Sequence, residues 1–173
     1  MTQLSYQAAF DPYHAVFRAL RLRGTCWAES AVHFDKLRIL DFYLTFPFFL
    51  KDMRLKRTDS WIRRVSKQYD GQKPFAKLPD GTTLVRRMEP YQLAAVQALT
   101  RHGYARKDQW DQRYVQASSQ TLPEELSARV KGLNNENQDL MSALRELSAN
   151  YELLGPDGLK DRSELLEYRY DAV

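Results

Sequence analysis

The chain has 173 residues, of which 43% are hydrophobic and 28% charged, a composition typical of a globular protein rather than a disordered one. No apolar run approaches the roughly 20 residues of a membrane span, and the first residues lack the layout of a secretory signal. A lone cysteine, Cys26, excludes an intramolecular disulfide and favours a reducing compartment. We therefore expect a cytoplasmic protein without a membrane partner.

The net charge of +4 conceals an uneven distribution along the chain. Residues 1–50 are nearly neutral, whereas residues 51–113 carry fifteen basic and seven acidic side chains. Residues 114–173 carry six basic and eleven acidic side chains. A basic middle and an acidic C-terminal third suggest different partners for different surfaces.

The first predicted elements are two helices. Asp11 and Pro12 provide an N-cap and a first-turn proline for a helix that ends near Gly24. Apolar residues at helical spacing predict a second helix over residues 30–46. Pro47 stops this helix or starts a short new turn.

The middle of the chain predicts short helices and a hairpin. Asp59 can cap a short helix, and residues 79–81 (Pro-Asp-Gly) predict a hairpin tip. Pro90 is expected to open a further helix, and residues 110–115 to form a short strand. These elements predict a mostly α protein with a small β hairpin, in which residues 1–118 form a winged-helix-like domain.

The last third predicts a long amphipathic helix over residues 124–154, within a second region, residues 119–173. Its apolar positions are spaced alternately by four and three residues, which is a heptad repeat. The seam either forms a coiled coil with another chain or packs on the chain's own domain. The acidic charge of this region favours a hetero-oligomer over a homo-oligomer, and a polar seam residue, Asn137, is of the type that selects register. The expected protein-binding positions are Leu126, Val130, Leu133, Asn137, Leu140, Leu144, Leu147 and Tyr151.

Short motifs for catalysis are absent from the sequence. No phosphate-binding glycine loop or nucleophile elbow occurs, and His14, His33 and His102 lie on separate predicted elements. Cys26 lies beside Trp27 and is expected to be a buried, inert thiol. We therefore predict no catalytic residue, no metal site, no cofactor and no enzyme activity, and an unrecognised small enzyme is the least favoured alternative.

The basic middle predicts a surface that contacts DNA through phosphates. Clustered lysine and arginine side chains neutralise phosphates without reading base sequence. The alternatives are a solvated basic face or a contact with an acidic protein. The candidate DNA-binding residues are Arg54, Lys56, Arg57, Arg63, Arg64, Lys67, Arg86 and Arg87.

Several segments between residues 10 and 105 carry a resemblance to a known family: FDPYHAVFR (10–18), DKLRILDFYL (35–44), LPDG (78–81), RMEPYQ (87–92) and HGY (102–104). Together they resemble the middle components of bacterial three-component systems. Those systems are built around an SMC-like ABC ATPase, and Lamassu-type antiphage defence is among them. The heptad-bearing region lies outside the resemblance.

The resemblance implies a small winged-helix-like subunit that bridges the ATPase and an effector, often a nuclease, and that has no active site of its own. We therefore expect a non-enzymatic adaptor in antiviral defence, with DNA contact through the basic middle. The alternative is a free-standing winged-helix transcriptional regulator that binds DNA through the same segment.

Overall fold

The computed structural model describes residues 7–74 and 77–167, and these residues form a protein that is mostly helical, as predicted, and that contains a small two-stranded antiparallel sheet. The α-helices are α2 (Pro12–Leu22), α3 (Phe34–Thr45), α4 (Trp61–Gln68), α5 (Gly81–Arg101), α6 (Lys107–Trp110), α7 (Glu124–Glu136), α8 (Gln138–Asn150) and α9 (Leu159–Ser163). The strands are β1 (Val32–His33) and β2 (Tyr114–Val115). Helical turns of other types are η1 (Arg23–Trp27), η2 (Pro47–Asp52), η3 (Arg57–Asp59) and η4 (Asp70–Gln72).

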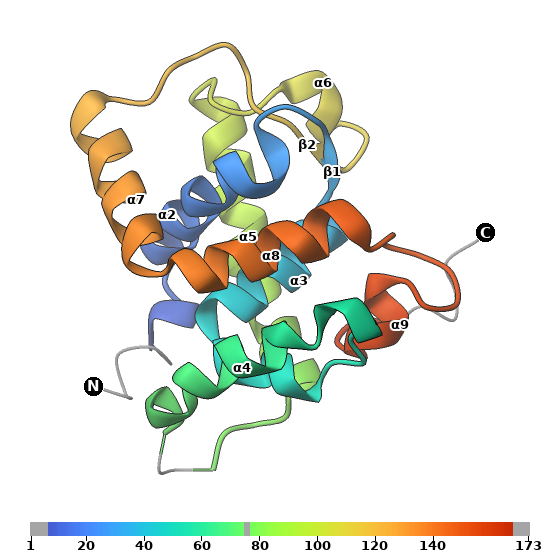
Figure 1. The fold of residues 1–173 in the computed structure, drawn as a ribbon. Helices are drawn as coiled ribbons and strands as arrows, with labels where there is room; N and C mark the ends of the chain where they lie inside the picture. The colour runs from blue at the N-terminus through green and yellow to red at the C-terminus, as the bar shows by residue number, and fades with distance from the viewer. Residues whose placement is uncertain (1–6, 75–76, 168–173) are drawn as a thin grey trace.

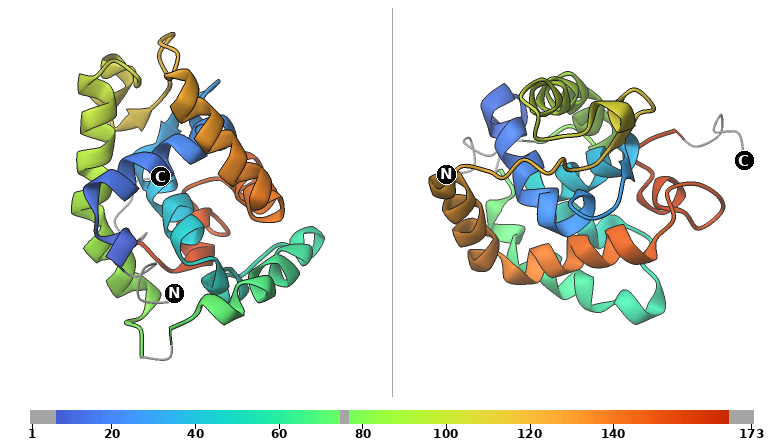
Figure 2. Two further views of the ribbon diagram at one scale, coloured as in Figure 1. Left: turned by 90° about the vertical axis from the view of Figure 1, so that its left-hand side faces the viewer. Right: turned by 90° about the horizontal axis from the view of Figure 1, so that it is seen from above.

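Helix α3 lies at the centre of the molecule. Helix α8 crosses it on one side and α5 runs behind it, with α2 alongside (Figures 1 and 2). Most of α3 is buried, including its apolar residues from Phe34 to Leu44. Asp11 caps α2 as predicted, because its carboxylate accepts a hydrogen bond of 2.9 Å from the amide of His14.

Helix α5 occupies the segment for which a hairpin was predicted, so that prediction is wrong. The carboxylate of Asp80 accepts hydrogen bonds from the amide (2.8 Å) and the hydroxyl (3.2 Å) of Thr83, which makes Asp80 a helix N-cap. An Asp-Gly pair suits either structure, and the buried residues Leu84 and Met88 that follow at helical spacing favour the helix. The predicted helix start at Pro90 is also wrong, because Pro90 lies inside α5 on its exposed side.

The sheet is formed by strands that are distant in the sequence. β1 pairs with β2 in antiparallel register, with Val32 opposite Val115. β2 lies within the stretch that was predicted to be a strand, whereas β1 lies where the helix over residues 30–46 was expected to begin. That helix begins only at Phe34, after the N-cap His33. A local hairpin wing is therefore absent from the described residues, and the winged-helix form is not confirmed.

Asp59 does not cap α4, contrary to the prediction. The N-cap is Ser60, whose side chain makes no capping hydrogen bond. Asp59 is buried, and its carboxylate accepts a hydrogen bond of 2.7 Å from the hydroxyl of Tyr151. That hydroxyl accepts a hydrogen bond of 2.9 Å from the amide of Lys56. Because Tyr151 directly follows α8, these bonds connect η3 and the start of α4 to the end of α8.

The single helix predicted over residues 124–154 is wrong. The chain forms two helices, α7 and α8, that meet at Asn137, whose backbone angles are φ −117° and ψ 38°. The side-chain amide of Asn137 donates to the carbonyl oxygen of Leu133 (2.9 Å), and its side-chain oxygen accepts from the hydroxyl of Tyr69 (3.2 Å). Asparagine competes with the main chain for such local bonds. Asn137, which was expected to select the register of a coiled coil, therefore interrupts the helix.

One hydrophobic core includes residues from both sides of the boundary expected between residues 118 and 119. Leu140, Leu144 and Leu147 of α8 are at most 2% exposed and belong to that core. Among the helices of the described residues, none combines the length and the apolar character needed to cross a membrane.

Candidate interaction surfaces

Two residues of the predicted DNA-binding segment, Arg54 and Lys56, make contacts within the protein. Arg54 forms an ion pair with Asp161, with 2.9 Å between nitrogen and oxygen. The ammonium group of Lys56 lies 4.5 Å from the ring centroid of Tyr151 and donates a hydrogen bond to the carbonyl oxygen of Asn150. These two side chains therefore attach the segments after α8 to the start of η3, and they are less available to phosphates.

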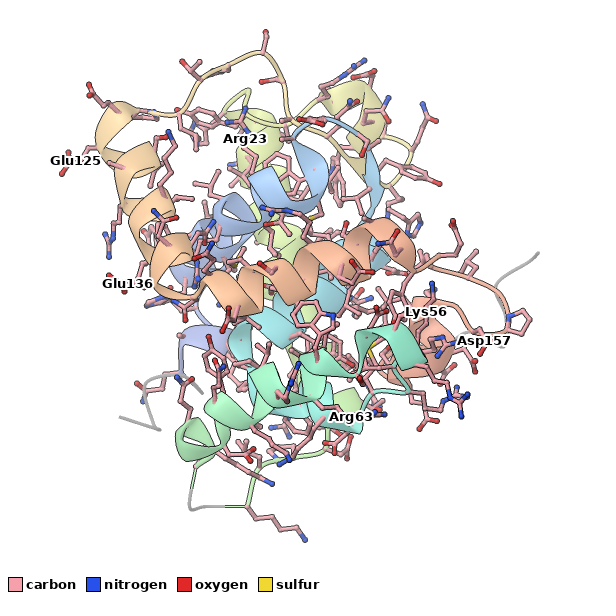
Figure 3. The ribbon with its side chains drawn as sticks, in the orientation of Figure 1. Arg23, Lys56, Arg63, Glu125, Glu136 and Asp157 are labelled. Atoms are coloured by element: carbon pink, nitrogen blue, oxygen red, sulfur yellow. The ribbon has the colours of Figure 1, made fainter. Side chains whose placement is uncertain are left out.

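Four other residues of the segment extend from η3 and α4 into solvent. Ile62 and Val65 are buried on the opposite side of α4, and no acidic residue occurs between positions 60 and 69. Within the described part of the chain, no carboxylate forms an ion pair with any of the four. Figure 3 shows one of them, Arg63, at the lower side of the molecule. We call this group the α4 basic face: Arg57, Arg63, Arg64 and Lys67.

The other two candidates, Arg86 and Arg87, lie in the second turn of α5 rather than after a hairpin. Both are exposed, and Arg87 borders a shallow surface pocket with Pro90 and Tyr91. Trp61, beside the α4 basic face, is half-buried and packs against the hydrophobic core. Its ring therefore anchors α4 to the rest of the molecule.

The apolar positions of the heptad repeat pack within the chain itself, which was one of the two predicted alternatives. Val130 and the seam residues of the α8 half are buried, and the remaining positions are half-buried. A partner cannot contact the buried leucines while this fold is intact. The buried positions are Val130, Leu140, Leu144, Leu147 and Tyr151, and the half-buried ones are Leu126, Leu133 and Asn137.

Buried charged side chains connect α2, α3 and α5. The guanidinium of Arg18 donates to both carboxylate oxygens of Asp41, at 2.6 and 3.1 Å, and to the carbonyl oxygen of Ala8 at 2.7 Å. Gln92 donates to the same carboxylate at 2.9 Å. Arg18, Asp41 and Gln92 are all at most 7% exposed, so each charge is buried together with its partners.

A second group of charged side chains, of which Arg38 and Lys160 are buried, connects α3 to α5 and α9. Arg38 donates to Asp35 (3.2 Å) and to Glu89 (3.0 Å), and the ammonium of Lys160 lies 2.8 Å from the other oxygen of Asp35. Burial alone would raise the pKa of Asp35, but the hydrogen bonds and charges of Lys160 and Arg38 outweigh burial and lower it. Asp35 is therefore ionised at neutral pH and holds α9 against the start of α3.

These charged groups belong largely to the segments that carry the resemblance, at residues 10–18, 35–44 and 87–92. We did not predict them as a group from the sequence. Asp35, Arg38 and Asp41 follow each other at intervals of three in a helix whose other residues are mainly apolar. Charges at such a spacing on an apolar helix indicate buried ion pairs, because unpaired charges are rarely buried.

A cleft of about 670 Å³ opens between β1 and the segment that follows α8. Cys26 borders this cleft, and its sulfur lies 3.3 Å from the carbonyl oxygen of Leu22. Burial raises the pKa of Cys26 to about 12, so the thiol remains protonated at neutral pH and is a weak nucleophile. Among residues 7–74 and 77–167, no three histidine, cysteine or acidic side chains lie close enough to hold a metal ion.

Comparison with known proteins identifies a family for this chain. A family model described as "ABC-three component (ABC-3C) system Middle Component 5" matches residues 4–171, which is nearly the whole chain. No curated protein and no solved structure matches the chain.

Proposed function

Because the chain belongs to the Middle Component 5 family of ABC-three component systems, we propose that it is a non-catalytic adaptor subunit in the cytoplasm. In this proposal it links an SMC-like ABC ATPase to an effector, such as a nuclease, in antiviral defence. The observation that carries the proposal is the family match, which extends over residues 4–171 and therefore includes the heptad-bearing region.

The side-chain chemistry of the described residues supports a binding role over a catalytic one. Two charged pairs, Arg18 with Asp41 and Lys160 with Asp35, are engaged within the protein and connect helices. The thiol of Cys26 is protonated at neutral pH. A connected, charge-paired core of this kind provides a firm scaffold whose surfaces can contact two partners.

The α4 basic face is the part of the surface that supports a contact with DNA. Its four cations are exposed and lie within eleven residues of the chain on η3 and α4, so they can contribute to one contact with a phosphate backbone. A free-standing winged-helix regulator is the weaker alternative, because the hairpin on which that hypothesis depended is part of helix α5.

Co-expression tests the adaptor proposal directly. The tagged chain is produced together with the ABC ATPase and the third component of its system, and the sample is separated by size-exclusion chromatography. We expect one peak that contains all three proteins. We also expect the chain alone to show no ATP hydrolysis and no DNA cleavage above buffer. Elution of the chain as a separate species, with the other two proteins together, would contradict the proposal.

A further inference from the structure

Arg54 and the α4 basic face belong to one basic stretch of the chain. Residues 54–67 carry six basic side chains and one acidic side chain, the buried Asp59. Arg54 precedes Arg57 by three residues, so their main-chain positions are at most about 11 Å apart. The side chain of Arg54 is 53% exposed. It is therefore close enough to contact the same phosphate backbone as the α4 basic face.

The C-terminal segment that packs beside this stretch has the opposite charge. Residues 150–167 contain five acidic and two basic side chains. Both cations are paired within the protein, Lys160 with Asp35 at 2.8 Å and Arg162 with Asp157 at 3.0 Å. Figure 1 shows α9, which is part of this segment, next to the chain that leads into α4. An acidic segment therefore lies against one end of the basic stretch.

Two carboxylates of this segment hold the guanidinium of Arg54. The carboxylate of Asp161 lies 2.9 Å from one of its terminal nitrogens, and the carboxylate of Glu164 lies 3.8 Å from its Nε. The guanidinium also donates a hydrogen bond to the carbonyl oxygen of Asp161. Carboxylate and phosphate oxygens bind the same donors of an arginine side chain. Within the chain, the two carboxylates therefore occupy the group that would bind a phosphate.

Main-chain contacts keep these carboxylates beside Arg54. The amide of Arg54 donates to the carbonyl oxygen of Arg162 at 3.1 Å, and the guanidinium of Arg162 donates to the carbonyl oxygen of Arg54 at 2.6 Å. The ion pair of Lys160 with Asp35 holds α9 against α3. The two carboxylates are therefore fixed next to Arg54 and compete with any phosphate that approaches it.

We propose that Asp161 and Glu164 inhibit DNA binding in cis by occupying Arg54. To bind a phosphate, the guanidinium must exchange both carboxylates for the phosphate oxygens, so the contact with α9 weakens the binding of DNA. Neutralising the two carboxylates frees Arg54 and adds one phosphate contact to those of the α4 basic face. This inference rests on the proposed contact with DNA and concerns the regulation of that site.

Neutral isosteres of the two carboxylates test the inhibition. Asp161→Asn combined with Glu164→Gln is compared with the parent for binding of duplex DNA by the assembled complex, followed by fluorescence anisotropy. We expect the Kd to fall about threefold to fivefold, because an exposed ion pair is a modest competitor. The slope of log binding constant against log salt concentration should steepen by up to about 0.9, for the contact that Arg54 gains. Glu164→Gln alone, at a side chain that is 75% exposed, should give part of the gain without disturbing the fold.

A matched pair of substitutions on α6 controls for the change in net charge. Asp108→Asn combined with Asp111→Asn removes the same two charges. It also frees two cations, Arg106 and Lys107, which lie 2.6 and 2.9 Å from those carboxylates. α6 lies at the opposite end of the molecule from α4 (Figures 1 and 2). Because salt screens charges over about 10 Å, this control should change the Kd by less than about twofold.

Arg54→Gln shows whether the gain passes through Arg54. Without Arg54, neutralising Asp161 and Glu164 should improve binding no more than the α6 control does. In the parent, where Arg54 is occupied, Arg54→Gln alone should weaken binding less than it does in the neutralised variant. Thermal melts and co-elution with the other components show that each variant is folded and assembled.

Three results would overturn the inference: no gain on neutralisation, an equal gain from the α6 control, or an equal gain with and without Arg54. If the three components co-elute but neither the parent nor the neutralised variant binds duplex DNA, the proposed contact with DNA fails together with this inference. If the parent binds DNA and the neutralised variant binds it equally well, only the inhibitory contact fails.

Discussion

The hydroxyl of Tyr151 donates a hydrogen bond of 2.7 Å to the carboxylate of Asp59, 92 residues earlier in the chain, and both side chains are buried. Two cations also lie near the ring of Tyr151, Lys56 at 4.5 Å and Arg162 at 5.8 Å from its centroid. This contact sets the end of α8 against η3. It therefore determines how the α4 basic face is presented next to the C-terminal part of the molecule.

Replacing Tyr151 with Phe removes the hydroxyl and leaves the ring. The carboxylate of Asp59 then keeps only the hydroxyl of Thr58, at 3.1 Å, as a side-chain partner. A buried acceptor that loses a partner costs about 1–3 kcal/mol, so we expect the free energy of unfolding to fall by roughly this amount. Urea denaturation followed by circular dichroism measures the change. Tyr13→Phe, at a tyrosine that is 84% exposed, should change the free energy of unfolding by less than about 0.5 kcal/mol.

The same tyrosine predicts a dependence of stability on alkaline pH. Burial raises the pKa of Tyr151 from 10.0 to about 12, with the neighbouring Asp59 adding to the shift. A pKa that is higher in the folded state than in the unfolded state stabilises the fold below pH 10, and this contribution is lost as the pH rises towards 12. The difference in unfolding free energy between the parent and Tyr151→Phe should therefore shrink above about pH 10. A constant difference from pH 8 to pH 11, measured with urea, would contradict this assignment.

Much of the helical architecture could be predicted from local signals. Asp11 followed by Pro12 begins a helix as expected, and the protein is mostly helical as predicted. The Asp-Gly pair at Asp80 could not be assigned from local sequence alone, since the same pair suits a turn and a helix N-cap. The sheet could not be predicted either, because β1 and β2 are distant in sequence and each has only two residues.

The candidate surfaces were less predictable than the fold. Whether a charged side chain is available to a partner depends on whether it forms an ion pair within the protein. Nothing in the sequence near Arg54 indicates that Asp161 will lie 2.9 Å away, whereas Arg63 remains without such a partner among the described residues. The heptad pattern predicted burial that the structure shows for its α8 half, whereas Leu126 and Leu133 are only half-buried and Leu154 is exposed. The pattern could not predict that Leu144 packs in the chain's own core, because helical periodicity identifies an apolar face but not the surface against which that face packs.

A double-mutant cycle tests the buried pair of Arg18 and Asp41. Asp41→Ala leaves the Arg18 guanidinium buried without its carboxylate, so we expect a loss of roughly 3–5 kcal/mol in the free energy of unfolding. Arg18→Met should cost a similar amount, and the double variant should cost clearly less than the sum of the two. Strict additivity in urea denaturation would mean that the two side chains do not interact as the 2.6 Å contact indicates.

Leu144 tests whether the heptad seam belongs to the chain's own core. This side chain is fully buried in α8, so Leu144→Ala should lower the free energy of unfolding by about 2–5 kcal/mol in the isolated chain. The neighbouring Arg145 is exposed, and Arg145→Ala should have an effect below about 0.5 kcal/mol. If Leu144→Ala left the melt of the isolated chain unchanged and impaired only the complex, the seam would be a surface for a partner.

The α4 basic face predicts how the protein responds to salt when it binds DNA. Reversing three of its charges, by Arg63→Glu, Arg64→Glu and Lys67→Glu, removes phosphate contacts without touching the buried side of α4. Each lost contact should lower the slope of log binding constant against log salt concentration by about 0.9. Binding of duplex DNA by the assembled complex, followed by fluorescence anisotropy at several salt concentrations, gives that slope. The thermal melt of the isolated variant should stay within a few degrees of the parent, because all three side chains are exposed.

A control with the same change in net charge separates a local site from general electrostatic attraction. Arg101, Lys131 and Arg145 are exposed on α5, α7 and α8, and reversing these three charges alters the net charge as much as the triple reversal on α4 does. A phosphate-binding face predicts that the control keeps the parent's slope, because counterion release depends on direct contacts rather than on total charge. Equal losses in both variants would assign the effect to net charge. An unchanged slope in both would mean that the four cations of the α4 basic face contact an acidic protein surface or solvent instead of DNA.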